Sequence, residues 1–122
     1  MIIVTGYFQV ARENRAPALV AARMLMSHSR REPGNNRYDF AEDIDVPGKF
    51  RFYEEWQSPL ALAAHLRAGY RLQFRKAVAS LGVLSADIKR VDSEAGAIHE
   101  PAMDTPEGQA TWSPTAAQPQ QG

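Results

Sequence analysis

The chain has 122 residues, which is enough for one domain and too few for two comfortable ones. Its 14 Lys and Arg balance 14 Asp and Glu, so the formal net charge is zero and nothing in the composition favours a nucleic-acid partner. The absence of cysteine excludes disulfides, thiolate catalysis and thiolate metal sites.

Neither the histidines nor the first residues indicate a metal or a membrane. The three histidines, His28, His65 and His99, are far apart and lack the close spacing of metal ligands. The opening MIIVTGYFQVAREN has an apolar run without a basic region before it or a cleavage site behind it, and this run is too short to cross a bilayer. We therefore expect a cytoplasmic protein without a metal site or a membrane anchor.

Residues 2–10 and the segment after them predict a strand followed by a helix. The first segment is rich in Ile, Val, Thr, Tyr and Phe, which suit a pleated, buried strand. Asn14 is a plausible N-cap and Pro17 falls in the first turn, so we expect a helix from there to about residue 31. Five residues form its expected apolar face: Leu19, Ala22 and Met26 in one stripe, with Val20 and Met24 beside it.

A β-hairpin is predicted next. Pro33 and Gly34 end the helix, and a strand follows in which Tyr38, Phe40 and Ile44 share one face. The residues DVPGKF then supply a turn. Alternate residues of the following strand lie on opposite faces: Phe50, Phe52, Glu54 and Trp56 on one, and Arg51, Tyr53 and Glu55 on the other.

A broken helix and a last strand complete the pattern. Ser58 and Pro59 match an N-cap followed by proline at the first helical position. The apolar pattern runs on to Leu81 but is interrupted around Gly69, where we expect the helix to break or kink. The residues ADIKRVDS, 86–93, alternate weakly and predict the last strand.

The order strand, helix, strand, strand, helix, strand predicts an α+β fold of the ferredoxin-like βαββαβ type, with two helices on one face of an antiparallel sheet. The other face also carries apolar and aromatic residues, so we expect a homodimer that packs sheet against sheet. We assign this domain to residues 1–93. Residues 94–122, rich in Pro, Gly and Gln, are either a flexible tail or an arm that Ile98, Met103 and Trp112 anchor on the partner subunit.

Three stretches, EPGNNRYDF, FRFYEEWQSPLALAAHL and YRLQF, make the sequence resemble the antibiotic biosynthesis monooxygenase family, including its quinol monooxygenase-like members. The pieces are specific in combination: a helix ending in Glu-Pro-Gly, a Tyr shortly after it, Tyr-Glu-x-Trp and Ala-His-Leu. The resemblance covers residues 2 to about 92. It implies a dimeric α+β barrel with a pocket between helices and sheet. It also implies oxidation of quinol-like aromatics with O2 and no metal, flavin or haem.

Departures from the family pattern bear on the substrate. Quinol-type members often have a second histidine five positions after the Ala-His-Leu histidine, where this chain has Tyr70. Haem-degrading relatives carry an Asn in the first strand, a Trp at the position of His65 and a His at that of Arg75, and this chain has none of these residues there. The resemblance therefore disfavours haem as the substrate.

His65 is the predicted catalytic base. A quinol must become a phenolate before it gives an electron to O2 readily, and the ordinary pKa of histidine, about 6.5, suits that proton transfer. The alternative is that His65 is a partly buried helix residue that bonds to a neighbour such as Glu54, an acid that would need a partner if buried. Tyr70 or Asn36 would steady the oxyanion, although packing at the helix break and turn chemistry also explain them.

Four residues are candidates for binding the aromatic ring: Trp56, Phe74, Met24 and Tyr53. Phe74 and Met24 should line the space between helices and sheet, while Trp56 and Tyr53 lie on opposite strand faces, so at most one of them reaches a given pocket. Core packing is the alternative role for each. The predicted function is cofactor-independent oxidation of a quinol or polyphenolic aromatic with O2. The alternatives are a non-catalytic dimer that binds a small ligand and, more distantly, a haem-degrading enzyme.

Overall fold

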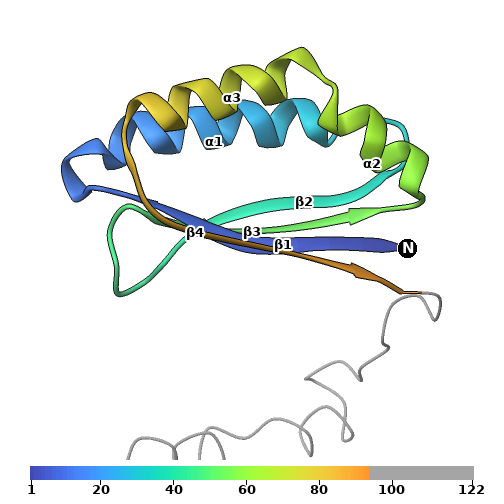
Figure 1. Cartoon of the computed structure of the whole chain (residues 1–122), viewed down its shortest axis with the longest axis horizontal. Helices are drawn as coiled ribbons and strands as arrows, with labels where there is room; N and C mark the ends of the chain where they lie inside the picture. Colours follow the sequence, from blue (N-terminus) through green and yellow to red (C-terminus); the bar gives the residue numbers. More distant parts are fainter. Residues whose placement is uncertain (94–122) are drawn as a thin grey trace, which may run out of the picture.

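The computed structural model describes residues 1–93, which form a four-stranded sheet with all helices on one face (Figure 1). Its elements in chain order are β1 (Ile2–Val10), a short 3-10 turn (Arg12–Asn14), α1 (Arg15–Ser29), β2 (Asn35–Glu42), β3 (Lys49–Trp56), α2 (Pro59–Leu66), α3 (Gly69–Ser80) and β4 (Val83–Asp92). The strand order is β2-β3-β1-β4, and every neighbouring pair is antiparallel. The ferredoxin-like prediction is confirmed. The expectations for residues 94–122 lie outside the described residues.

Side-chain alternation along β1 and β3 builds the core beneath the helices. Ile2, Val4, Phe8 and Val10 of β1 are buried, and the register pairs the first three with residues of β3 on the same face. Phe50 and Trp56 of β3 are almost fully buried there. The helix-facing side of the sheet is thus the aromatic side that the sequence pattern predicts.

The buried face of α1 differs in part from the predicted one. Ala18, Ala22, Leu25 and Ser29 face the sheet, whereas Val20 and Met24 are more than half exposed. The predicted stripe is confirmed, since Ala22 is buried and Leu19 and Met26 pack against the core, but the prediction for Val20 and Met24 was wrong.

The predicted strand position of Ile44 was also wrong. β2 ends at Glu42, and Ile44 is 99% exposed. The Asp43 carboxylate accepts hydrogen bonds from the backbone N–H groups of Asp45 and Val46, which closes a turn immediately after the strand.

The break in the second helical segment is confirmed. The Ser58 hydroxyl caps α2 by accepting a hydrogen bond from the Ala61 backbone N–H, and Pro59 occupies the first turn. α2 ends at Leu66, and α3 begins at Gly69. This break lets α2 lie over the end of β3 while α3 runs beside α1 (Figure 1). No helix within residues 1–93 is long and apolar enough to span a membrane.

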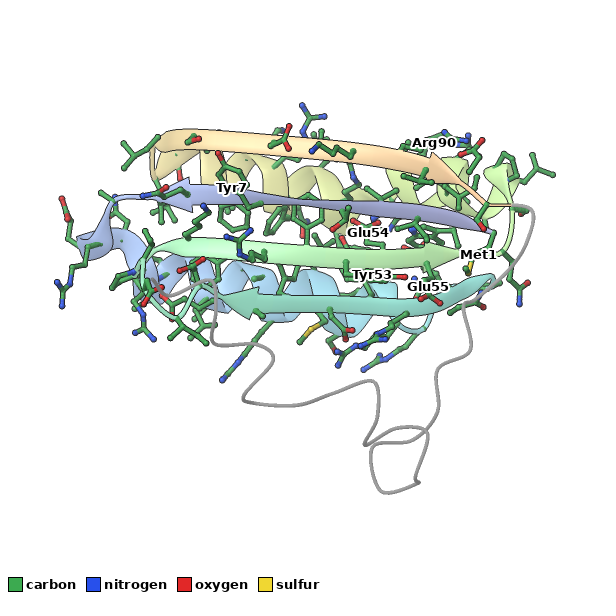
Figure 2. The ribbon with its side chains drawn as sticks, turned by 90° about the horizontal axis from the view of Figure 1, so that it is seen from below. Met1, Tyr7, Tyr53, Glu54, Glu55 and Arg90 are labelled. Carbon is green, nitrogen blue, oxygen red and sulfur yellow. The ribbon has the colours of Figure 1, made fainter. Side chains whose placement is uncertain are left out.

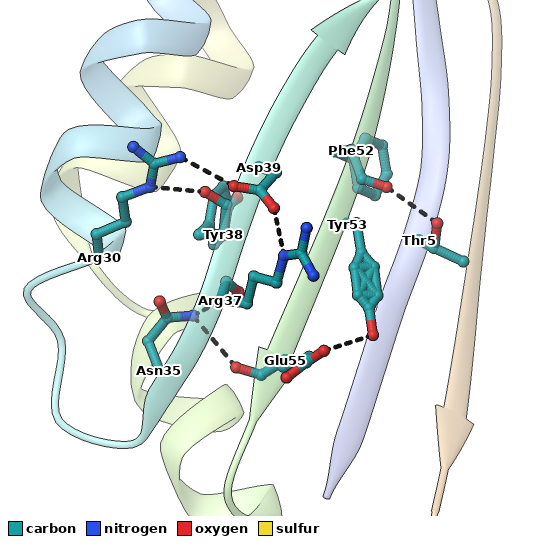
Figure 3. A network of polar contacts seen from close by, with 9 residues as sticks. All are labelled: Thr5, Arg30, Asn35, Arg37, Tyr38, Asp39, Phe52, Tyr53 and Glu55. Carbon is teal, nitrogen blue, oxygen red and sulfur yellow. Dashed lines mark hydrogen bonds and ion pairs between the residues drawn. The ribbon is translucent and has the colours of Figure 1, made fainter. Parts of the chain in front are cut away.

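The outer face of the sheet carries aromatic rings among charged groups. Tyr7 and Tyr53 lie on this face, with the helices behind the sheet (Figure 2). The Tyr7 hydroxyl lies 2.6 Å from that of Ser85. Figure 3 shows the Tyr53 hydroxyl, which donates to Glu55 over 2.6 Å. The guanidinium of Arg37 stands 5.5 Å from the Tyr53 ring centroid. This face is therefore more polar than the sequence pattern suggests.

Gly6 tests how closely β1 and β4 pack. A Cβ at this position would overlap the backbone carbonyl of Asp87 on β4, so Gly6→Ala should lower the free energy of unfolding by about 2 kcal/mol or more in urea denaturation. Gly69→Ala is the control, because a Cβ at Gly69 meets open space. It should change stability by less than about 1 kcal/mol. Equal effects of the two substitutions would contradict the close approach of β4.

Candidate functional site

A cavity of about 1000 Å³ lies between α3 and the helix-facing side of the sheet. Aromatic rings dominate its walls, with Phe8, Phe40 and Phe52 from the strands and Phe74 from α3. The ring of Phe74 stands 5.7 Å from that of Phe8 and 5.8 Å from that of Phe40. The walls are therefore suited to a flat aromatic ligand.

The cavity is open along β4. Ile88, on the helix-facing side of β4, is 63% exposed, and Leu72 of α3 across from it is 52% exposed. Both residues line the cavity. The cavity is therefore exposed to solvent at these residues of α3 and β4.

Glu54 is an acid in the cavity wall with almost no contact with water. It lines the cavity from β3 and is 6% exposed. The Trp56 indole N–H donates a hydrogen bond to its Oε1 over 2.9 Å. Burial raises the pKa of Glu54 to about 7, against the opposing effects of hydrogen bonds from Trp56 and Tyr38 and of the charge of Arg71. The carboxyl can therefore exist in either protonation state near neutral pH.

His65 lies behind Glu54 and does not line the cavity. It is 1% exposed, and its ring centroid stands 4.6 Å from that of Trp56 and 5.4 Å from that of Tyr38. Its Nδ1 lies 3.0 Å from Oε1 of Glu32, and its Nε2 lies 4.0 Å from Oε1 of Glu54. Burial lowers the pKa of His65, although Glu32 opposes the effect. A neutral ring that donates Nδ1–H to the Glu32 carboxylate presents its Nε2 lone pair to Glu54.

Glu32 connects His65 and Glu54 to a second hollow. It borders a second, smaller hollow of about 410 Å³, which Tyr70 and Pro33 also line. Glu32, His65 and Glu54 therefore form a row that runs from this hollow to the wall of the large cavity. Within the row, Glu32 and His65 are at hydrogen-bond distance, whereas His65 and Glu54 are close but not hydrogen-bonded.

Three basic side chains of α3 add positive charge to the lining of the cavity. Arg71, Arg75 and Lys76 all line it. None of the three forms an ion pair with an acid among residues 1–93. Cations beside an apolar pocket favour a ligand that carries or develops negative charge.

The predicted ring-binding residues are divided among different surfaces. Phe74 lies in the cavity wall. Trp56 is fully buried and does not line the cavity, although it donates a hydrogen bond to Glu54, which does. Tyr53 lies on the outer face of the sheet. The prediction that Met24 lines the space between helices and sheet was wrong, because it is 58% exposed on the solvent side of α1.

The predicted oxyanion partners lie outside the large cavity. Tyr70 borders the second hollow, where its ring stacks on that of His28 at 4.9 Å, and its hydroxyl is buried without a partner among residues 1–93. Asn36 is exposed on β2. Neither side chain is placed to contact a ligand bound against Phe74.

Sequence reasoning missed Arg71 as a cavity residue and treated Glu54 only as a buried acid in need of a partner. A signal exists for each residue. Glu54 alternates with Phe52 and Trp56, which marks an acid on an apolar strand face. Arg71 precedes Phe74 by three residues, so both share one face of α3.

Comparison with known proteins assigns this arrangement to a family. The antibiotic biosynthesis monooxygenase model matches residues 1–77, which include the first seven elements as far as most of α3. The chain belongs to this family. The match covers Glu54, His65 and the cavity-lining residues of α3 up to Lys76.

Individual relatives support the assignment. "Putative monooxygenase YcnE" of Bacillus subtilis (strain 168) is 35% identical over 65 residues, which cover 53% of this chain and 68% of YcnE. The structure of a "putative antibiotic biosynthesis monooxygenase" from Deinococcus radiodurans matches with a TM-score of 0.77 and 25% identity, over 84% of this chain and all of that one. A protein of the same description from Nitrosomonas europaea gives a TM-score of 0.71 and 27% identity, over 77% and 99% of the two chains.

Glu54→Gln should change how stability depends on pH. Because the pKa of Glu54 rises from 4.5 to about 7 on folding, the folded state binds this proton more tightly, and stability falls as pH rises between these values. Gln does not titrate, so the variant should gain about 3 kcal/mol relative to the wild type over that window. Urea denaturation at a series of pH values measures the difference. A difference that stays constant with pH would show that the carboxyl is not buried as described.

Proposed function

We propose that this member of the family is a cytoplasmic, cofactor-independent monooxygenase that oxidises a quinol or polyphenolic aromatic with O2. One observation supports it most strongly: an aromatic-walled cavity holds a buried carboxyl group and three basic side chains of α3 that form no ion pair with another residue of the described range 1–93. The walls suit the ring, the Glu54–His65 pair suits removal of a phenolic proton, and the cations suit the resulting anion.

The reaction balances without a reductant. One oxygen atom of O2 bonds to a ring carbon of the quinol, and the other leaves as water with two hydrogen atoms of the substrate. The product is a hydroxyquinone, and O2 receives all the electrons that the substrate loses. Deprotonation comes first, because the phenolate gives an electron to O2 far more readily than the phenol does. Apolar walls keep water away from the radical pair.

The roles of the side chains follow from their positions. The Glu54–His65 pair removes the proton, and Phe74 and the strand aromatics hold the ring. Tyr70 and Asn36 lie outside the cavity, so the basic side chains of α3 take the oxyanion role predicted for them. Arg71 is the basic residue whose charge acts on both Glu54 and His65.

Oxygen uptake by the metal-stripped protein tests the proposal. Hydroquinones, naphthols and anthrones should consume O2 above their autoxidation rate, and His65→Ala should slow the best substrate by about 100-fold or more. His28→Ala is the matched control, because that histidine is exposed on α1 and lines neither cavity. It should retain the wild-type rate. Binding of these compounds without O2 uptake would favour the alternative, a non-catalytic ligand-binding protein.

We also propose that two chains pack through the outer faces of their sheets. Ile3, Tyr7, Tyr53 and Val91 lie on this face by register, and no helix within residues 1–93 covers it (Figure 2). A domain of this size gains stability by burying such a surface.

Light scattering at micromolar concentration tests the dimer. It should return twice the chain mass of 13.5 kDa. Ile3→Glu places a charge on the outer face and should shift the mass toward that of the monomer. Gln73→Glu is the control, because Gln73 is exposed on α3 on the opposite side of the sheet. A monomer mass for the wild type would refute this mode of association.

A further inference from the structure

We propose that Glu54 is the catalytic group that accepts the phenolic proton, and that His65 and Glu32 act through it as positioning residues. This inference rests on the proposed function and differs from the sequence-based hypothesis, which gives the proton to His65 directly. Three observations carry it: the contact of each group with the cavity, the distances along the row, and the hydrogen bond that fixes the carboxyl.

Contact with the cavity separates the two candidates. Glu54 lines the cavity, whereas His65 lines neither hollow and is 1% exposed. A general base must come within hydrogen-bond distance of the proton that it removes. A ligand against Phe74 reaches the carboxyl of Glu54 but finds the ring of His65 behind it.

The carboxyl is held in place by a hydrogen bond from Trp56. The Trp56 N–H fixes Oε1 of Glu54 at 2.9 Å, and His65 Nε2 faces the same oxygen at 4.0 Å. Glu32 in turn holds the other ring nitrogen of His65 at 3.0 Å. Trp56 therefore fixes the orientation of the carboxyl, while His65 and Glu32 lie behind it and supply the charge and polarity that it faces away from the cavity.

The proton transfer conserves atoms and charge. The phenolic O–H bond breaks, its electron pair stays on the substrate oxygen, and the proton forms a new O–H bond on the Glu54 carboxylate. The negative charge thereby moves from Glu54 to the substrate, beside Arg71. After oxygen has added to the ring, Glu54 returns this proton to the oxygen atom that leaves as water. The carboxylate is then ready for the next cycle.

The groups around Glu54 set the pH at which it acts. Tyr38 faces it from β2, His65 from α2 and Arg71 from α3, while Val4 is its partner on β1 and Arg90 lies next to Val4 on β4.

With a pKa of about 7, the carboxyl of Glu54 is a base only above that pH, so the oxidation rate should rise through neutrality. The charge of Glu32 raises this pKa. Glu32→Gln should therefore move the rise to lower pH although Glu32 never contacts the cavity.

The first experiment measures the hydrogen bond to Glu54 without any oxidation. The probes are 2-naphthol and its methyl ether, 2-methoxynaphthalene, which lacks the proton. At pH 8 the wild type should prefer the naphthol, because its O–H donates to a carboxylate. Glu54→Gln, which offers only a neutral acceptor, should reduce this preference by about tenfold. Glu55→Gln is the matched control from the neighbouring position on the outer face, and it should keep the preference.

The second experiment measures O2 uptake against pH with the same variants. Glu54→Gln should slow oxidation by about 100-fold and remove the rise near pH 7, whereas Glu32→Gln should shift the rise to lower pH. If the oxidation rate of Glu32→Gln rises at the same pH as that of the wild type, Glu32 does not act on Glu54.

The two experiments separate the two proposals. An unchanged naphthol preference in Glu54→Gln refutes Glu54 as the acceptor, whatever oxygen uptake shows. A preference that depends on Glu54, without oxygen uptake from any compound, refutes the proposed oxygenase activity but supports Glu54 as the acceptor of the phenolic hydrogen bond. Failure of both naphthalenes to bind the wild type, together with no oxygen uptake from any compound of the panel, refutes both.

Discussion

The candidate site depends on the alternation of side chains along β3. This strand directs Phe50, Phe52, Glu54 and Trp56 toward the helices, so one acid shares a face with three large aromatic residues. The same alternation directs Tyr53 to the outer face, where it bonds to Glu55 (Figure 3). Because the side-chain period of a strand is two, a shift of one residue would exchange the two sets. Register therefore fixes both the cavity and the surface opposite it.

Placing a carboxyl in this face has an electrostatic cost that the neighbouring groups reduce without removing it. Trp56 donates a hydrogen bond, and Arg71 contributes positive charge, yet the pKa of Glu54 stays well above its ordinary value. A fully compensated acid would remain ionised and would accept a proton poorly near neutral pH. The incomplete compensation is what makes the group chemically useful, at some expense in stability.

The break between α2 and α3 determines what surrounds that carboxyl. α2 brings His65 behind β3, where Glu32 contacts it from the turn between α1 and β2. α3 starts anew at Gly69 and lies across the sheet with Phe74 and Arg71 directed into the cavity. A continuous helix would have fixed these residues in one helical phase, since side chains of one helix keep a period of 3.6 residues. Two short helices position them independently.

The sequence by itself determined the fold and the family: strand alternation, helix caps and the break at Gly69 are local signals, and each predicted its element. It also identified His65 and Phe74 as candidate site residues. It did not determine which side chains share a cavity. Met24, Tyr70 and Asn36 are each reasonable candidates by residue type, but their directions depend on helix phase and on packing between distant segments. The contact of His65 with Glu32, 33 residues away along the chain, exists only after the sheet has assembled. Tertiary structure alone therefore put Glu54, and not His65, at the cavity wall.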